Sequence, residues 1–204
     1  MATLPSTRTA VPTAPDTASP SATPATPATP ATYQIDPAAS RVVFAIGLRL
    51  FFVKGSTVTG RFADVAGTIT LDEQDPSTAQ AAVTIGAASV DTRNARRDTH
   101  LRTADFFHVD QHPTLTFRSR RVEPVAPAEG RYRVADDLTL HGVTREVVLE
   151  AHYAPALGAG RDRRIALTLT APLNRRDFEM AQNNPVFRVA DDLTVTLTIE
   201  ATRV

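Results

Sequence analysis

Apolar and polar residues alternate with a period of two along most of the chain after Thr32. Over residues 41–50 the larger side chains, Val42, Phe44 and Ile46 among them, fall on one face and smaller or charged ones on the other. Such alternation is typical of a β-strand with one buried face. Further strands of this kind are expected over residues 62–71, 82–90, 114–118, 132–140, 146–153, 164–171 and 193–200, with a short one at 33–35.

Turn-forming residues separate these segments, so the strands are expected to follow one another as hairpins. The turns are predicted near Asp75–Pro76, Glu129–Gly130, Gly142 and Gly158–Asp162. A chain of hairpins leaves two sheet edges unless it closes, and about eight strands can close around side chains or one small ligand. The pattern therefore predicts an all-β fold class, an antiparallel barrel of about eight strands. Alternation alone leaves open whether the interior is filled or hollow.

Two segments depart from a simple run of strands. Residues 94–109 mix charged and apolar positions at helical spacing, which predicts one short helix across an end of the barrel. Residues 132–140 nearly repeat as residues 187–195, but their flanks do not. Two copies are too few for a repeat architecture. The similarity therefore indicates two strands with the same local bend rather than a duplicated functional loop.

The first 32 residues form a separate region of Ala, Thr, Pro and Ser that ends in an Ala-Thr-Pro repeat. Such a segment buries too little apolar surface to offset its ordering entropy and favours an extended spacer. We therefore predict a disordered tail over residues 1–32 and one domain over residues 33–204. The tail lacks the apolar stretch of a secretory signal, so the sequence predicts a cytoplasmic protein.

Composition removes several classes of function. Basic and acidic residues both total 22, so no net field favours nucleic acid or an anionic membrane surface. The absence of cysteine excludes disulfides, thiol nucleophiles and thiolate zinc sites. No apolar run approaches the roughly 20 residues that span a bilayer, so no integral membrane contact is expected.

Polar residues are densest between Arg93 and Pro113, which include three of the five histidines. His108 and His112 would share a face of a helix and could hold a metal, but Pro113 and the strand after it argue against a helix there, so we predict no metal site and no cofactor. Several arginines here could bind a phosphate or pyrophosphate through paired hydrogen bonds. A solvated network with Asp98 and Asp105 is the competing interpretation.

The same segment carries a family resemblance. It joins other short motifs that resemble the signatures of the YceI-like, polyisoprenoid-binding family, in the same order. These motifs are Ile35-Asp36 with Ser40 to Phe44, Asp98-Thr99-His100-Leu101 with Asp105-Phe106-Phe107, His112 to Ser119, Leu138 to Val147, and Asn174 to Phe178. The resemblance covers essentially residues 33–204 and implies an extended antiparallel lipocalin-like β-barrel with a helix near its mouth, without catalysis. This chain has Ala39 and Gly47 where the family often has His, and Asp136 and Glu179 where Gly is usual.

The resemblance also implies an apolar channel for a polyisoprenoid or a related amphiphile such as a quinone or fatty amide, which the protein would bind, transport or store. From the inward parity of the strands we predict that the channel is lined by Phe44, Ile46, Phe62, Ile69, Val83, Ile85, Phe117, Leu140, Leu149, Leu169 and Leu197. The helical segment joins two long strands, so its basic residues are expected beside the polar head group at one mouth. These residues are Arg93, Arg96, Arg97, His100 and Arg102.

Two other functions compete with the carrier. A solid barrel could act as a structural or stress-related interaction module, and a homodimer is left open. A hydrolase or isomerase could use His100, His141, Asp98 or Asp105 as a general acid or base. The sequence contains no nucleophile elbow, phosphate-binding loop, dinucleotide motif or zinc-protease helix, which disfavours the enzyme.

Overall fold

The computed structural model describes residues 30–50, 53–125, 129–180 and 187–204. They form one antiparallel sheet, one α-helix and several short 3-10 turns. The strands are β1 (Ala31–Ile35), β2 (Arg41–Leu50), β3 (Val53–Phe62), β4 (Val65–Leu71), β5 (Gln80–Gly86), β6 (Val90–Asp91), β7 (Thr114–Pro124), β8 (Arg131–Leu140), β9 (Val143–Leu157), β10 (Arg164–Asn174) and β11 (Phe187–Arg203).

Eight of these strands close into a barrel, as the alternation predicted. Around the ring, β1 pairs with β4, and the order continues through β5, β7, β8, β9, β10 and β11. Closure comes from β11 pairing back onto β1, where Tyr33 lies opposite Arg203 and Ile35 opposite Ala201. The closed antiparallel barrel with one helix confirms the predicted fold class.

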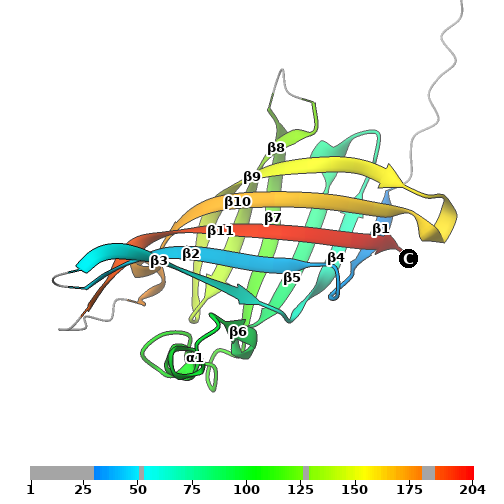
Figure 1. Cartoon of the computed structure of the whole chain (residues 1–204). Helices are drawn as coiled ribbons and strands as arrows, with labels where there is room; N and C mark the ends of the chain where they lie inside the picture. The colour runs from blue at the N-terminus through cyan, green and yellow to red at the C-terminus, as the bar shows by residue number, and fades with distance from the viewer. Residues whose placement is uncertain (1–29, 51–52, 126–128, 181–186) are drawn as a thin grey trace, which may run out of the picture.

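The barrel is extended at one end by strands outside this ring. The earlier part of β11 pairs with β2, which pairs with β3, which in turn pairs with the short β6. Helix α1 (Ala95–Arg102) follows β6 and lies at this end, away from β1 and the C-terminus (Figure 1). We call this end the mouth.

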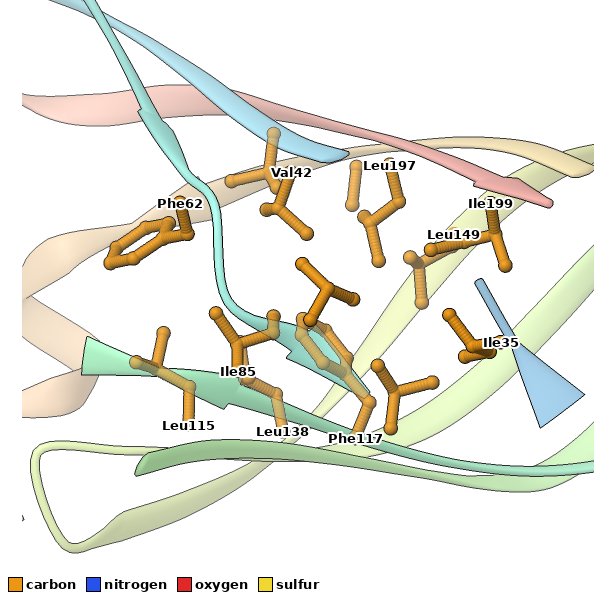
Figure 2. Close-up of a cluster of buried hydrophobic side chains, with 14 of the residues drawn as sticks. Ile35, Val42, Phe62, Ile85, Leu115, Phe117, Leu138, Leu149, Leu197 and Ile199 are labelled. Carbon is orange, nitrogen blue, oxygen red and sulfur yellow. The ribbon is translucent and has the colours of Figure 1, made fainter. Parts of the chain in front are cut away.

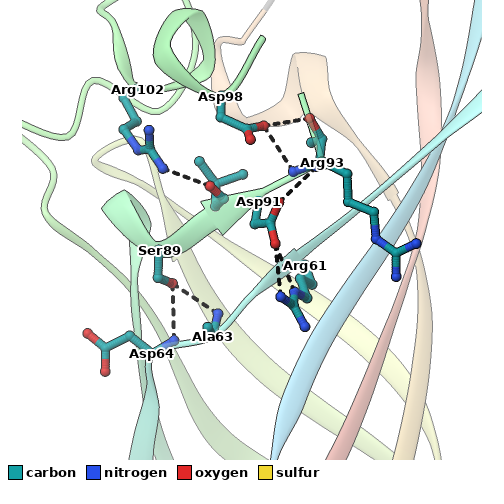
Figure 3. Close-up of polar contacts among 10 residues, drawn as sticks. Arg61, Ala63, Asp64, Ser89, Asp91, Arg93, Asp98 and Arg102 are labelled. Carbon is teal, nitrogen blue, oxygen red and sulfur yellow. Dashed lines mark hydrogen bonds and ion pairs between the residues drawn. The ribbon is translucent and has the colours of Figure 1, made fainter. Parts of the chain in front are cut away.

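Helix α1 is fixed at the mouth by capping and by polar contacts to β6 (Figure 3). The Asn94 side chain caps the helix by accepting a hydrogen bond from Arg97 N at 3.1 Å. Asp98 is buried and accepts a hydrogen bond from Thr92 N at 2.9 Å. The Arg102 guanidinium donates to the carbonyl of Val90 at 2.9 Å. The short helix predicted within residues 94–109 is therefore present and anchored to the sheet.

The barrel interior is apolar because every second strand residue points inward. Along β11, Val195, Leu197 and Ile199 are buried. Phe117 on β7 lies across the barrel interior from Leu197 and Ile199 (Figure 2). The inward faces of all the ring strands contribute to a single hydrophobic core. Packing of these faces explains why the period-two pattern persists to the end of the chain.

Two details refine the sequence predictions. Strand β1 begins at Ala31, and residues 31 and 32 pair with β4, so the folded part starts two residues before the predicted boundary. Residues 1–29 of the predicted tail lie outside the described residues. Pairing shifts register beside both copies of the internal repeat, opposite Asp136 in β8 and between Val189 and Leu193 in β11. No described helix is long and apolar enough to cross a membrane.

Candidate functional site

A cavity of about 650 Å³ occupies the mouth half of the barrel. Side chains from β2, β7, β8 and β11 form its walls, and Leu101, Phe106 and Phe107 from α1 and the loop after it cover it. Most of the lining is apolar. The volume falls within the range of about 300–1,000 Å³ that is common for small-molecule sites. We call it the main cavity.

A second cavity of about 90 Å³ lies further along the barrel, and Phe117 lines both cavities. All eleven residues predicted to line a channel lie on the wall of one or the other. Phe44, Ile46, Phe62, Ile85, Phe117 and Leu140 line the main cavity, and Ile69, Val83, Phe117, Leu149, Leu169 and Leu197 line the second. Their contact with a ligand stays a prediction.

Three of the five predicted head-group residues, Arg96, Arg97 and His100, line the main cavity at its mouth. The Arg97 guanidinium is held by the Thr92 hydroxyl at 2.7 Å and the Thr92 carbonyl at 2.9 Å. Arg96 is exposed, and its side chain makes no hydrogen bond or ion pair within the described part of the chain. Arg96 is therefore the cation at the mouth that is most available to an anionic group.

The other two predicted head-group residues do not line the cavity. Arg93 is exposed at the end of β6, where its backbone N–H donates to Asp91. Arg102 directs its guanidinium to the carbonyls of Ala88, at 2.8 Å, and Val90. The sequence grouped them with the mouth arginines because all lie in one short segment. The helix turns Arg102 toward β6, which gives it a structural role.

Sequence reasoning missed one buried cation, Arg175, on the wall of the main cavity. Its guanidinium donates to the carbonyls of Ala190, at 3.0 Å, and Met180, and lies 2.7 Å from a carboxylate oxygen of Asp191. Asp191 also pairs with Arg176 at 2.7 Å, and this hydrogen bond is the main reason that the pKa of Asp191 is lowered. The only sequence signal for Arg175 was its place in the family motif that includes Arg176.

A second missed residue is Asp136, which points into the barrel between Val134 and Leu138 and lines the second cavity. Its side chain is 6% exposed, and one carboxylate oxygen has no hydrogen-bond partner among the described residues. Burial, with a smaller contribution from neighbouring Asp137, raises the pKa of Asp136 to about 6. The period-two pattern already gave Asp136 an inward parity, so the signal was present.

The groups considered for acid–base chemistry do not converge on one point of the cavity. Asp98 is occupied by Thr92, and His100 pairs with Asp105 at 3.0 Å where both side chains are about half exposed. His141 lies in the turn between β8 and β9 and contacts the Phe178 carbonyl at 3.2 Å. These contacts give each group a local structural partner.

A metal site at His108 and His112 was excluded from the sequence because no helix was expected there, and that reasoning was incomplete. No helix forms there, but a turn does, because the N–H of His112 donates to the His108 carbonyl at 2.8 Å. His141 from the β8–β9 turn joins the two rings. The prediction of no metal site considered only a helix and did not include His141.

The opposite end of the barrel carries a polar cluster of different character. The Arg163 Nε–H is shared between the two carboxylate oxygens of Glu73, at 2.6 and 2.9 Å, and Glu73 also accepts hydrogen bonds from Arg163 Nη2 and from the Tyr33 hydroxyl. The bonds from Arg163 are the main reason that the pKa of Glu73 is lowered, whereas burial raises the pKa of Tyr33 to about 12. The charges of Glu73 and Arg163 are therefore satisfied by each other.

Comparison with known proteins places this geometry in a family. Residues 33–201 match the model of the YceI-like domain. A UPF0312 protein of Photorhabdus laumondii is 37% identical over 164 residues, which cover 78% of this chain and 80% of that protein. Protein YceI of Escherichia coli O157:H7 is 34% identical over 152 residues, covering 72% and 75% of the two chains.

Solved structures agree with the sequence matches. The Campylobacter jejuni YceI protein superposes with a TM-score of 0.67 at 28% identity, covering 76% of this chain and 90% of that one. A polyisoprenoid binding domain from Saccharophagus degradans superposes with a TM-score of 0.63 at 18% identity, covering 84% and 98%. The match to the domain model and these relatives show that the chain belongs to the YceI-like family.

Proposed function

We propose that this protein binds an amphiphilic lipid and carries or stores it without chemical change. The main cavity is the observation on which the proposal rests, because it is roomy, mostly apolar and covered by α1. Removing apolar surface from water contributes about 25 cal/mol for each Å², so an isoprenoid or acyl chain could bind there without a polar contact. A polyisoprenoid, a quinone and a fatty amide all have a suitable chain.

The comparisons support this ligand class only indirectly. The Saccharophagus degradans domain is named for polyisoprenoid binding, but at 18% identity its likeness supports the fold and not the ligand. The cavity of this chain supplies the independent argument, and it disfavours a solid barrel that acts only as an interaction module. The cytoplasmic location stays a prediction, testable by cell fractionation, and the homodimer stays open, testable by analytical ultracentrifugation.

The first experiment asks whether a lipid occupies the main cavity. Purified protein is extracted with organic solvent, the extract is analysed by mass spectrometry, and uptake of a fluorescent isoprenoid is measured. Ile46→Trp places a large ring on the cavity wall and should reduce lipid content and uptake, while Val148→Trp on the exposed outer face should not. No lipid and no uptake in the unaltered protein, or equal loss in both variants, would reject the proposal.

The second experiment locates the head group. If a phosphate or pyrophosphate lies at the mouth, Arg96→Ala should weaken binding of an isoprenyl pyrophosphate about 10-fold or more, since a charge-assisted hydrogen bond is lost. Binding of the matching alcohol should change little, and the difference should shrink at high salt. Arg93→Ala is the matched control, because Arg93 is also exposed but lies off the cavity wall. Equal effects on both ligands, or on both variants, would remove Arg96 from the head-group site.

Recovery of the bound lipid distinguishes a carrier from an enzyme. A carrier returns the lipid chemically unchanged after long incubation. Turnover that disappears in a folded His100→Ala variant would instead support the hydrolase or isomerase, since His100 is the acid–base candidate on the cavity wall.

A further inference from the structure

Three histidines from two separate loops come together, and none of them lines the main cavity. His108 and His112 lie in the loop between α1 and β7, and His141 lies in the turn between β8 and β9. One ring nitrogen from each residue lies within 4.8 Å of the other two. The ring centroids are 5.7 Å apart for His108 and His112, 5.2 Å for His112 and His141, and 6.3 Å for His108 and His141. All three side chains are half-buried, so an ion could reach them.

The backbone holds the first two rings on the same side of their loop. The His108 carbonyl accepts hydrogen bonds from Gln111 N at 3.0 Å and His112 N at 2.8 Å, and the His108 N–H donates to the Thr103 carbonyl at 2.9 Å. These bonds close a turn that brings residues 108 and 112 together without a helix.

The third ring is oriented by a hydrogen bond to the backbone. Nδ1 of His141 lies 3.2 Å from the Phe178 carbonyl, and a carbonyl can only accept. Nδ1 therefore carries the proton, and the lone pair of the neutral ring is on Nε2. Metal-binding histidines commonly have this arrangement, in which a hydrogen bond from the other nitrogen fixes the tautomer and the ring plane.

Gly142 makes room for the His112 ring. A Cβ on Gly142 would lie 2.6 Å from Cε1 of His112, which is closer than atoms can approach. Gly142 also has a φ of +75°, in the left-handed region that favours glycine. The β8–β9 turn therefore brings His141 into the cluster and leaves space for His112 beside it.

We propose that His108, His112 and His141 form a binding site for a divalent transition metal of the zinc and copper class. Three neutral imidazoles suit Zn²⁺ and Cu²⁺, whereas Mg²⁺ and Ca²⁺ prefer oxygen ligands. Tetrahedral zinc with Zn–N bonds of about 2.0–2.1 Å separates its nitrogens by about 3.4 Å, so the three rings need to close by little more than about 1 Å. A fourth position would remain open to water or an anion, as in other sites with three protein ligands.

The test uses the full-length protein and zinc chloride alone, in buffer without competing chelators. Isothermal titration calorimetry should show one zinc ion per chain, and binding should weaken at least about 10-fold in each of His108→Gln, His112→Gln and His141→Gln. His152→Gln is the matched control, because His152 is exposed on β9, away from the cluster. Circular dichroism verifies that each variant is folded.

A second measurement does not depend on these variants. In the unaltered protein, NMR of the histidine side chains should show zinc shifting the ring signals of residues 108, 112 and 141 and leaving those of His152 unchanged. Absence of stoichiometric zinc binding, or equal loss in His152→Gln, would overturn the proposal. Lipid binding rests on the main cavity, so either proposal can fail without the other.

Discussion

Asp136 should make the stability of this barrel fall as the pH rises. Its carboxyl is buried in an apolar interior, and burial raises its pKa from 3.8 to about 6. The folded state therefore holds a proton that the unfolded state releases between these two values. Below pH 3.8 the carboxyl is largely protonated in both states, so its burial costs little stability. Above about pH 6 it is ionised in both states, and the full cost of burying the charge lowers the free energy of unfolding. The difference between the two pKa values corresponds to a loss of about 3 kcal/mol in the free energy of unfolding.

Asp136→Asn isolates this effect, because an amide has nearly the same shape and no charge. An amide also needs buried partners, so the useful quantity is the change with pH in the stability difference between the two proteins. Urea unfolding, followed by circular dichroism between pH 3 and pH 8, should show that the variant gains about 3 kcal/mol of stability relative to the unaltered protein. Asp162→Asn, at an exposed position, is the control and should show no such gain. Parallel stability curves for Asp136→Asn and the unaltered protein would refute the reasoning.

Three further predictions concern other parts of the barrel. Phe117→Ala should lower the free energy of unfolding, measured with urea, by about 3–5 kcal/mol. It should also join the two cavities that Phe117 separates, so the variant should prefer a longer chain in a series of isoprenoids; an unchanged preference contradicts this. Glu73→Gln should lower the free energy of unfolding by about 1 kcal/mol at neutral pH, because it weakens the pair with Arg163. Since the folded-state pKa of Glu73 is lowered, the two proteins should become equally stable once acid protonates Glu73, which thermal melts at several pH values test. Arg175→Met should cost about 3 kcal/mol in urea unfolding because the carbonyls of Met180 and Ala190 and the Asp191 carboxylate lose the buried donor that they share, whereas Arg176→Met, at an exposed position, should cost less than about 1 kcal/mol.

The barrel wall could be predicted from sequence because its determinant is local. Strand residues two positions apart share a face, so Phe44 and Leu197 are assigned to the interior by the alternation in their own strands. Parity says nothing about the distance between opposite walls. The sequence therefore could not decide between a filled barrel and a hollow one, and the cavity of about 650 Å³ had to come from the packing.

The repeated Ala-Asp-Asp segments show where local reasoning ends. Asp136 and Asp191 occupy equivalent places in the repeat, yet Asp136 is buried and forms no ion pair among the described residues, while Asp191 pairs with Arg175 and Arg176. In β11 the extra residues at the register shift release Asp191 toward the turn that follows β10. In β8 the irregularity falls on the partner strand, so Asp136 keeps its inward parity. The fate of each carboxylate depends on the neighbouring strand, which no single segment encodes.

The two ends of the barrel differ in how their charges are satisfied, and this difference indicates where a head group would lie. At the end that contains β1, Arg163 is held by hydrogen bonds from its Nε and Nη2 to Glu73, so an incoming anion would have to displace a carboxylate. At the mouth, Arg96 has no such partner among the described residues and lies on the wall of the larger cavity. An amphiphile that buries its chain in the main cavity therefore meets an available cation at the mouth. Arg96→Glu reverses the charge at position 96 and should weaken binding of an isoprenyl pyrophosphate more than Arg96→Ala does, because the carboxylate repels the pyrophosphate. Equal binding of the pyrophosphate to these two variants would show that the head group lies elsewhere.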